Sequence, residues 1–135
     1  KRVSVGLDQN RLSLQLAILH KHSGIATFDQ DVFINVVGGI KVSETASDLV
    51  VMLAIVSSLR DKVIPSKWIA FGEVGLTGEV RPVYNSMERL SEAQKQGFEI
   101  AIIPKGNAPK KPIKGMKVVT VGYLYQAIQY LLENS

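Results

Sequence analysis

Residues 49–56 form the longest unbroken apolar run in the chain. A helix that is apolar on every side packs inside a domain and not on its surface. The β-branched residues of this run leave a buried strand open on pattern alone. However, polar residues frame about four helical turns, which is long for a strand, and Thr45 and Asp48 have the spacing of a capping box. The pattern therefore predicts a buried central helix from about Thr45 to Arg60.

Before this helix, the apolar positions change between strand spacing and helix spacing. Val3 and Val5 alternate with polar neighbours and predict a short strand. Leucines at helical spacing predict a helix over residues 8–23. Residues 25–28 and 31–37 are predicted to be two strands around a tight turn.

After the central helix, the pattern predicts a strand pair followed by further helices and strands. The pair covers residues 68–73 and 79–83, with Gly75 and Gly78 in the turn between them. The later elements are a helix over 85–96, a strand over 100–103, an exposed loop over 105–115, a strand over 117–121 and a helix over 123–133. Because strands and helices alternate, we predict a single α/β domain over residues 1–135, with mixed sheets around the buried helix.

Composition narrows the possible chemistry. Hydrophobic residues make up 46% of the chain and charged residues 21%, which is typical of a globular domain. The chain contains no cysteine, which excludes thiolate catalysis and cysteine-based zinc sites. No signal peptide or membrane segment is visible, which indicates a cytoplasmic setting and no membrane partner. Because the chain begins with Lys1 and not with methionine, we expect a piece of something longer.

The net charge of +4 is distributed unevenly. Residues 29–99 carry an excess of acidic groups, whereas residues 100–132 carry only basic ones. The basic residues of this last stretch are Lys105, Lys110, Lys111, Lys114 and Lys117. Lysine suits phosphate contacts that do not read sequence, so a polyanion such as DNA is the predicted partner and these lysines its predicted binding residues. A solubilising loop is the alternative. No aromatic residue is interleaved with the lysines, so base stacking is not indicated.

Other candidate sites are weaker. His20 and His22 are two positions apart, so on a helix they point to different sides and no metal site is expected. Glu73 and Glu79 could act as an acid and a base, but hydrogen bonding to backbone is the favoured interpretation. The sequence contains neither a P-loop nor a GxGxxG pattern, so we expect no nucleotide cofactor in this segment.

A family resemblance is carried by residues 72–83, Gly-Glu-Val-Gly-Leu-Thr-Gly-Glu-Val-Arg-Pro-Val. They resemble the Gly-Glu-x-x-Leu-x-Gly-x-Val-x-Pro strand pair of the Lon protease domain. Together with residues 31–39, 43–48 and 56–61, they resemble the C-terminal Lon-like domain of the bacterial RadA (Sms) family of recombination and repair ATPases. The resemblance covers essentially the whole chain. It implies a Lon protease-like fold, similar to domain 2 of ribosomal protein S5.

Lon proteases use a serine–lysine dyad, and in register its positions here are Ala46 and Met87. Alanine has no oxygen to act as nucleophile and a thioether cannot take up its proton, so the resemblance implies a protease-dead domain. Both residues are then expected to pack inside the domain. Met87 is expected on the inner face of its helix, together with Leu90 and Ala93. A peptidase with a displaced dyad stays open through Ser47, although this residue lies about 100° around the helix from Ala46.

The resemblance also implies a role in recombinational repair. RadA-type proteins are similar to hexameric helicases that use ATP to drive branch migration, with a zinc-binding N-terminus and a RecA-like ATPase. ATP, Mg and Zn are therefore expected only in those domains. For this segment it implies a non-catalytic scaffold that forms a homohexameric ring, binds single-stranded and branched DNA, and meets the recombinase RecA. A purely structural oligomerisation domain is the other alternative.

Overall fold

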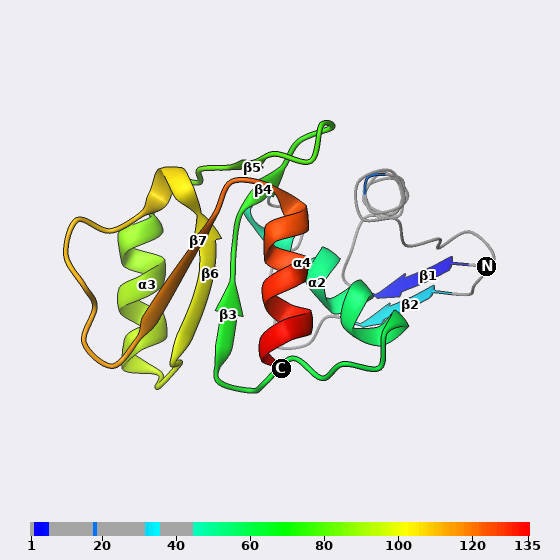
Figure 1. Cartoon of the computed structure of the whole chain (residues 1–135), viewed down its shortest axis with the longest axis horizontal. Coiled ribbons are helices and arrows are strands. Elements are labelled where there is room, and N and C mark those ends of the chain that lie inside the picture. Colours follow the sequence, from blue (N-terminus) through cyan, green and yellow to red (C-terminus); the bar gives the residue numbers. More distant parts are fainter. Residues whose placement is uncertain (1, 6–17, 19–31, 36–44) are drawn as a thin grey trace.

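A three-stranded parallel sheet with helices on both faces organises the structure. The computed structural model describes residues 2–5, 18, 32–35 and 45–135. The sheet has the strand order β3-β6-β7, formed by β3 (Trp68–Ala70), β6 (Ile100–Pro104) and β7 (Lys117–Val121). Helix α3 (Ser86–Lys95) covers one face, and α4 (Leu124–Asn134) covers the other (Figure 1). The predicted α/β class is confirmed.

Two smaller sheets accompany the large one. Strands β1 (Arg2–Val5) and β2 (Val32–Asn35) pair in parallel, and β4 (Glu73–Val74) and β5 (Val80–Arg81) pair antiparallel. The sheets are therefore mixed, as predicted. The short strand predicted at Val3 and Val5 is confirmed as β1. The helix predicted over 8–23 and the strand over 25–28 lie outside the described residues, apart from Ile18, which is helical and buried.

The central helix is present and buried. A single 3-10 turn, η1 (Thr45–Ser47), leads into α2 (Asp48–Leu59). Leu49, Met52 and Val56 are fully buried. The start differs from the prediction: the N-cap of α2 is Ser47, whose side chain makes no cap bond, and not Thr45. The Asp48 carboxylate accepts a hydrogen bond from the backbone of the neighbouring strand β4.

The strands of the large sheet separate two apolar clusters. Because successive residues of a strand point to opposite faces, Ile102 packs with α2 and α4, whereas Ala101 and Ile103 pack with α3. Leu90 and Ala93 supply the α3 side of the second cluster. Leu90 and Ala93 are thus buried, as the helical spacing predicted.

Two predictions of this region are wrong. Residues 68–73 do not form one strand, because the chain leaves the large sheet after Ala70 and enters β4 at Glu73. Met87 is 53% exposed and does not belong to the apolar cluster that contains Leu90 and Ala93. Within the described part of the chain, no helix is long and apolar enough to cross a membrane.

Candidate functional site

The start of α2 is held against the β4 segment by backbone bonds. The Gly72 amide donates to the Ala46 carbonyl (2.8 Å), and the Leu49 amide donates to the Gly72 carbonyl (3.0 Å). The Val74 amide donates to Asp48 Oδ2 (3.0 Å), and Asp48 is almost fully buried. These three bonds fix the position at which the Lon resemblance places a nucleophile.

Gly72 is required at this junction by close packing. A Cβ at this position would lie 2.9 Å from Val80 Cγ1 and 3.2 Å from Pro104 Cγ, and the residue has a φ of +153°. A real Cβ almost never comes within 3.0 Å of another atom. The glycine therefore allows η1, β4 and β5 to meet, and it explains why strand β3 cannot continue directly into β4.

A hollow of about 440 Å³ opens beside Ala46. Its walls include Thr45 and Ala46 from the start of the helix, Glu73 from β4, and Arg89 from α3. Neither Met87 nor Ser47 is among its lining residues. The structure therefore does not bring the two dyad positions together around this hollow.

Arg89 is a functional candidate that the sequence analysis did not single out. It belongs to α3 and lines the hollow. Arg89 Nε donates to the Tyr84 carbonyl (3.1 Å), and the guanidinium carbon lies 5.9 Å from the centre of the Phe71 ring. A guanidinium stays protonated and cannot act as a base. Its bonding partner Tyr84 and its ring contact Phe71 both lie outside α3, so helical spacing did not identify it.

Glu73 and Glu79 both pair with Arg81. Glu73 Oε1 lies 3.5 Å from Arg81 Nη1, and Glu79 Oε2 lies 2.9 Å from Arg81 Nη2. Glu79 also accepts from the Thr77 hydroxyl (2.6 Å) and the Thr77 amide (3.2 Å). The Thr77 hydrogen bond, followed by the Arg81 bond, lowers the pKa of Glu79 to about 2. The interpretation as a backbone-bonding group is therefore confirmed for Glu79.

The predicted DNA-binding lysines are spread from one end of the large sheet, along the loop between β6 and β7, to the other end. The parallel register sets Lys117 opposite Ile100 and Val121 opposite Pro104. Lys105 follows Pro104, so it and Lys117 lie at opposite ends of the sheet, roughly 16 Å apart along the strands. Lys117 Nζ lies 5.6 Å from the centre of the Tyr130 ring. All five lysines are exposed, but they do not form one cluster.

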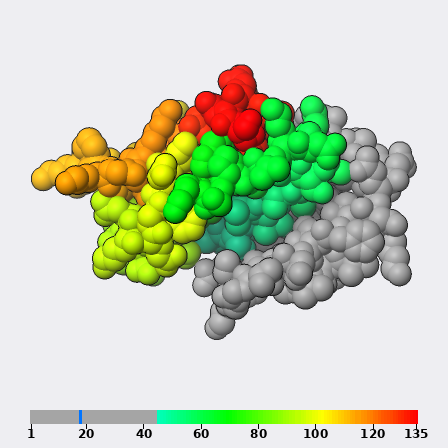
Figure 2. Space-filling view, turned by 90° about the horizontal axis from the view of Figure 1, so that it is seen from below, coloured from blue at the N-terminus to red at the C-terminus, as the bar shows by residue number. Residues whose placement is uncertain are grey.

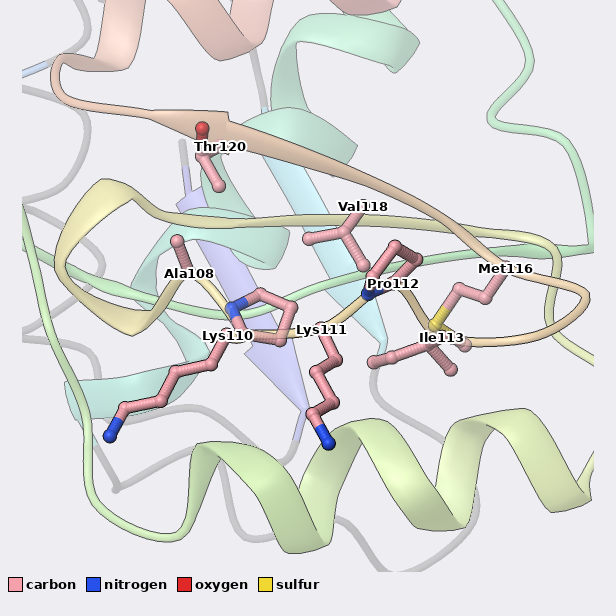
Figure 3. A pocket seen from close by; sticks show the side chains of 9 residues that line it. Ala108, Lys110, Lys111, Pro112, Ile113, Met116, Val118 and Thr120 are labelled. Atoms are coloured by element: carbon pink, nitrogen blue, oxygen red, sulfur yellow. The ribbon is translucent and has the colours of Figure 1, made fainter.

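Lys110, Lys111 and Lys114 share the loop that connects β6 to β7. This loop begins with a 3-10 turn, η2 (Lys105–Asn107). It projects from the body as the orange part at the left of Figure 2. Lys110 and Lys111 extend their ammonium groups to the same side of the loop (Figure 3). Between the loop and β7 lies a hollow of about 340 Å³.

The loop is tied to the body at its base and through α3. Asn107 Oδ1 accepts from the Val83 amide (2.8 Å), and Asn107 Nδ2 donates to the Val83 carbonyl (3.1 Å). Gln94 Nε2 donates to the Lys114 carbonyl (2.7 Å). The side chain of Asn107 thus replaces a strand partner for Val83.

The part of the chain that the structure describes contains no candidate metal site. No group of three or more His, Cys, Asp or Glu residues is placed there to hold an ion. His20 and His22 lie outside the described residues, so the prediction that they hold no metal stays a prediction.

Comparisons with known proteins give a consistent result. A family model described as subunit ChlI of Mg-chelatase matches residues 8–107. The DNA repair protein RadA of Pseudomonas aeruginosa is 59% identical over 98% of this chain and 29% of its own length. The proteins of the same name from Escherichia coli and Bacillus subtilis are 56% and 41% identical over 95% and 96% of the chain. The chain spans less than a third of the length of these relatives.

Proposed function

Because this chain belongs to the family described as subunit ChlI of Mg-chelatase, and because it matches RadA-type DNA repair proteins over nearly its whole length, we propose that it serves DNA repair as a non-catalytic, DNA-contacting domain. The domain covers residues 1–135 of a longer protein. The domain contributes a surface that contacts DNA and a scaffold for assembly, and it performs no covalent chemistry of its own.

The exposed loop carrying Lys110, Lys111 and Lys114 is the observation that carries this proposal. Prolines and glycines hold the loop in solvent, and Figure 2 shows it standing out from the body. Ammonium groups on such a projection can reach phosphates without the domain moving. Binding of this kind is electrostatic, does not depend on sequence and weakens with salt. Lys105 and Lys117 would contact DNA at the two ends of the sheet.

The composition of the Ala46 hollow supports the absence of catalysis. It offers the Thr45 hydroxyl, the Glu73 carboxylate and the Arg89 guanidinium, but Glu73 is paired with Arg81. The described residues that line it include no lysine. A serine–lysine peptidase needs a hydroxyl and a neutral amine within hydrogen-bonding distance.

Peptidase activity can be tested directly with casein and unstructured peptides. We expect no turnover from the chain as it stands, and none from an Ala46→Ser variant, because the described residues that line the hollow include no lysine to act as its base. Cleavage by the unaltered chain that is lost in Ser47→Ala would establish the displaced dyad and overturn this part of the proposal.

The longer protein supplies the remaining activities. We propose that its other domains hold ATP, Mg and Zn and act as a DNA-dependent ATPase and branch-migration helicase. In this proposal the domain joins subunits into a homohexameric ring on single-stranded or branched DNA, in contact with RecA. A ring needs a heterologous interface, in which one face of the domain docks on a different face of the next.

The decisive experiment measures the affinity for duplex and single-stranded DNA as a function of salt. Replacing Lys110, Lys111 and Lys114 with alanine should weaken binding and reduce the log–log salt slope on duplex by about 2 to 3. The matched control replaces Lys62, Lys67 and Lys95 with alanine, which removes the same charge elsewhere. The salt slope of this control should stay close to that of the unaltered chain. Equal losses in the two variants would show that net charge matters and not the loop.

Assembly is tested by sedimentation with and without DNA. A ring-forming domain should sediment faster as its concentration rises or when DNA is present. A species that stays monomeric under all these conditions would remove ring assembly from the proposed role. Assembly without any retention of DNA at low salt would instead support the purely structural alternative.

A further inference from the structure

The carboxyl end of the parallel sheet gathers segments that are far apart in sequence. Strand β7 ends at Val121, opposite Pro104, so Gly122 and Lys105 both emerge at this end. The β4–β5 hairpin is bonded to the same place, because the Val80 amide donates to the Gly122 carbonyl (2.9 Å). Figure 1 shows η2, β5 and the start of α4 together there. In open α/β sheets this end is the usual place for ligands.

Two tyrosines form an exposed stacked pair at the start of α4. The ring centres of Tyr123 and Tyr125 are 6.0 Å apart with an angle of 23° between the planes. The residues are 50% and 55% exposed. Tyr130, on the same helix, is different: it is partly buried and its ring lies 5.3 Å from that of Trp68. The Tyr123–Tyr125 pair is therefore not part of the core.

The backbone under this pair is held from two sides. Gln126 Oε1 accepts from the Tyr123 amide (3.0 Å) and from the Gly122 amide (2.7 Å). The Leu124 amide donates to the Gly78 carbonyl of the hairpin turn (2.8 Å), and Glu79 forms a β-bridge with Tyr123. A fixed aromatic pair can accept a ligand with little loss of conformational entropy.

The hairpin beside the pair carries two carboxylates and one guanidinium, and Lys105 adds an ammonium group at the same end of the sheet. Arg81 is neutralised by Glu79 and Glu73, and because the pKa of Glu79 is about 2, this carboxylate stays charged at neutral pH. Lys105, one residue beyond Pro104 at the same end of the sheet, is exposed. The surface thus combines two aromatic faces with one nearby ammonium group.

We propose that Tyr123 and Tyr125 are a stacking platform for the bases of single-stranded DNA, with Lys105 contacting the adjoining phosphate. Stacking on aromatic side chains tolerates every base, because each base has a π-face. The bases of a duplex are already stacked on one another, so the platform distinguishes single strands from duplex, which the lysine loop does not. This inference rests on the proposed function, since both have DNA as the ligand.

The test uses a labelled oligothymidylate and a labelled duplex with the whole chain. Replacing both tyrosines with leucine should weaken single-strand binding by about fivefold or more and leave duplex binding unchanged. The Tyr123→Phe/Tyr125→Phe variant keeps the rings and should bind like the parent chain. Tyr84→Leu is the matched control, because Tyr84 is 91% exposed and lines the Ala46 hollow.

The outcomes separate this inference from the proposed function. Normal single-strand binding by the leucine variant, with binding lost in the lysine-loop variant, would overturn the platform and leave the proposed function standing. Absence of DNA binding by the parent chain would overturn both. A leucine variant that sediments differently but binds single strands normally would show that the pair is a contact between copies of this chain, which also overturns the platform.

Discussion

The start of α2 and the loop between β6 and β7 are held in opposite ways. At the start of α2, three backbone amides donate into one junction, two of them to carbonyls and one to the buried Asp48 carboxylate. Gly72 is packed there too closely for any side chain. The lysine loop is joined to the body by the hydrogen bonds of Asn107 and Gln94. A Cβ on Gly115, in the same loop, would have no atom within 4 Å. One region is fixed by packing and the other is open to solvent.

This difference separates stability from binding. The α2 junction is firmly held, although the two positions that the Lon resemblance assigns to a catalytic dyad are occupied by Ala46 and by the exposed Met87. The loop carries charge but little of the core. We therefore expect substitutions at the junction to change folding and not DNA affinity, and substitutions in the loop to do the reverse.

The largest effect is expected at Gly72. Gly72→Ala places a methyl group against Val80 and Pro104, and it should lower the free energy of unfolding by about 3 kcal/mol, measured by urea denaturation. The matched substitution in the loop is Gly115→Ala. It meets no atom and carries only the strain of a φ of +77°, so it should cost about 1 kcal/mol. Equal costs at the two glycines would contradict the comparison.

Asp48 is expected to come next. Asp48→Ala leaves the buried Val74 amide without this acceptor and should lower the free energy of unfolding by about 2 kcal/mol. Asp48→Asn keeps an acceptor oxygen and should recover part of the loss. A fully stable alanine variant would mean that the junction does not depend on this carboxylate.

The lysine loop should behave in the opposite way in the same denaturation assay. Replacing Lys110, Lys111 and Lys114 with alanine should change the free energy of unfolding by no more than about 0.5 kcal/mol, as is usual for exposed residues. The DNA affinity of the same preparation should fall. If stability falls together with affinity, the loop is part of the core and the two regions are not distinct.

The smallest effect is expected from Glu79 and depends on pH. Its pKa in the folded protein, about 2, lies below the ordinary value of 4.5 for a glutamate, so folding favours the charged form. The stabilisation is complete above about pH 4.5 and is lost as the pH falls toward 2. Glu79→Gln should flatten the stability curve in this window and leave neutral pH almost unaffected. An unchanged curve would show that the Thr77 and Arg81 bonds contribute little.

The sequence alone determined the elements and the family. A run of apolar residues that would cover every side of a helix predicted α2. Glycine and proline positions, together with the spacing of apolar residues, predicted α3, β6, β7 and α4. These signals are local in the sequence. The predicted resemblance to the RadA family is confirmed by relatives at 41% to 59% identity. The likeness to the Lon protease domain stays a prediction, and the bonding partner of Asp48 was missed because it lies in β4.

Only the tertiary structure decided which residues meet. Strand register placed Lys105 and Lys117 at opposite ends of one sheet, although both belong to the same basic stretch of sequence. It placed Lys105 at the same end of the sheet as the Tyr123–Tyr125 pair, although no aromatic residue is interleaved with the lysines. The physical reason is that periodicity reports which face a side chain takes on its own element. Its neighbours across the sheet are set by hydrogen bonds between strands that are distant along the chain.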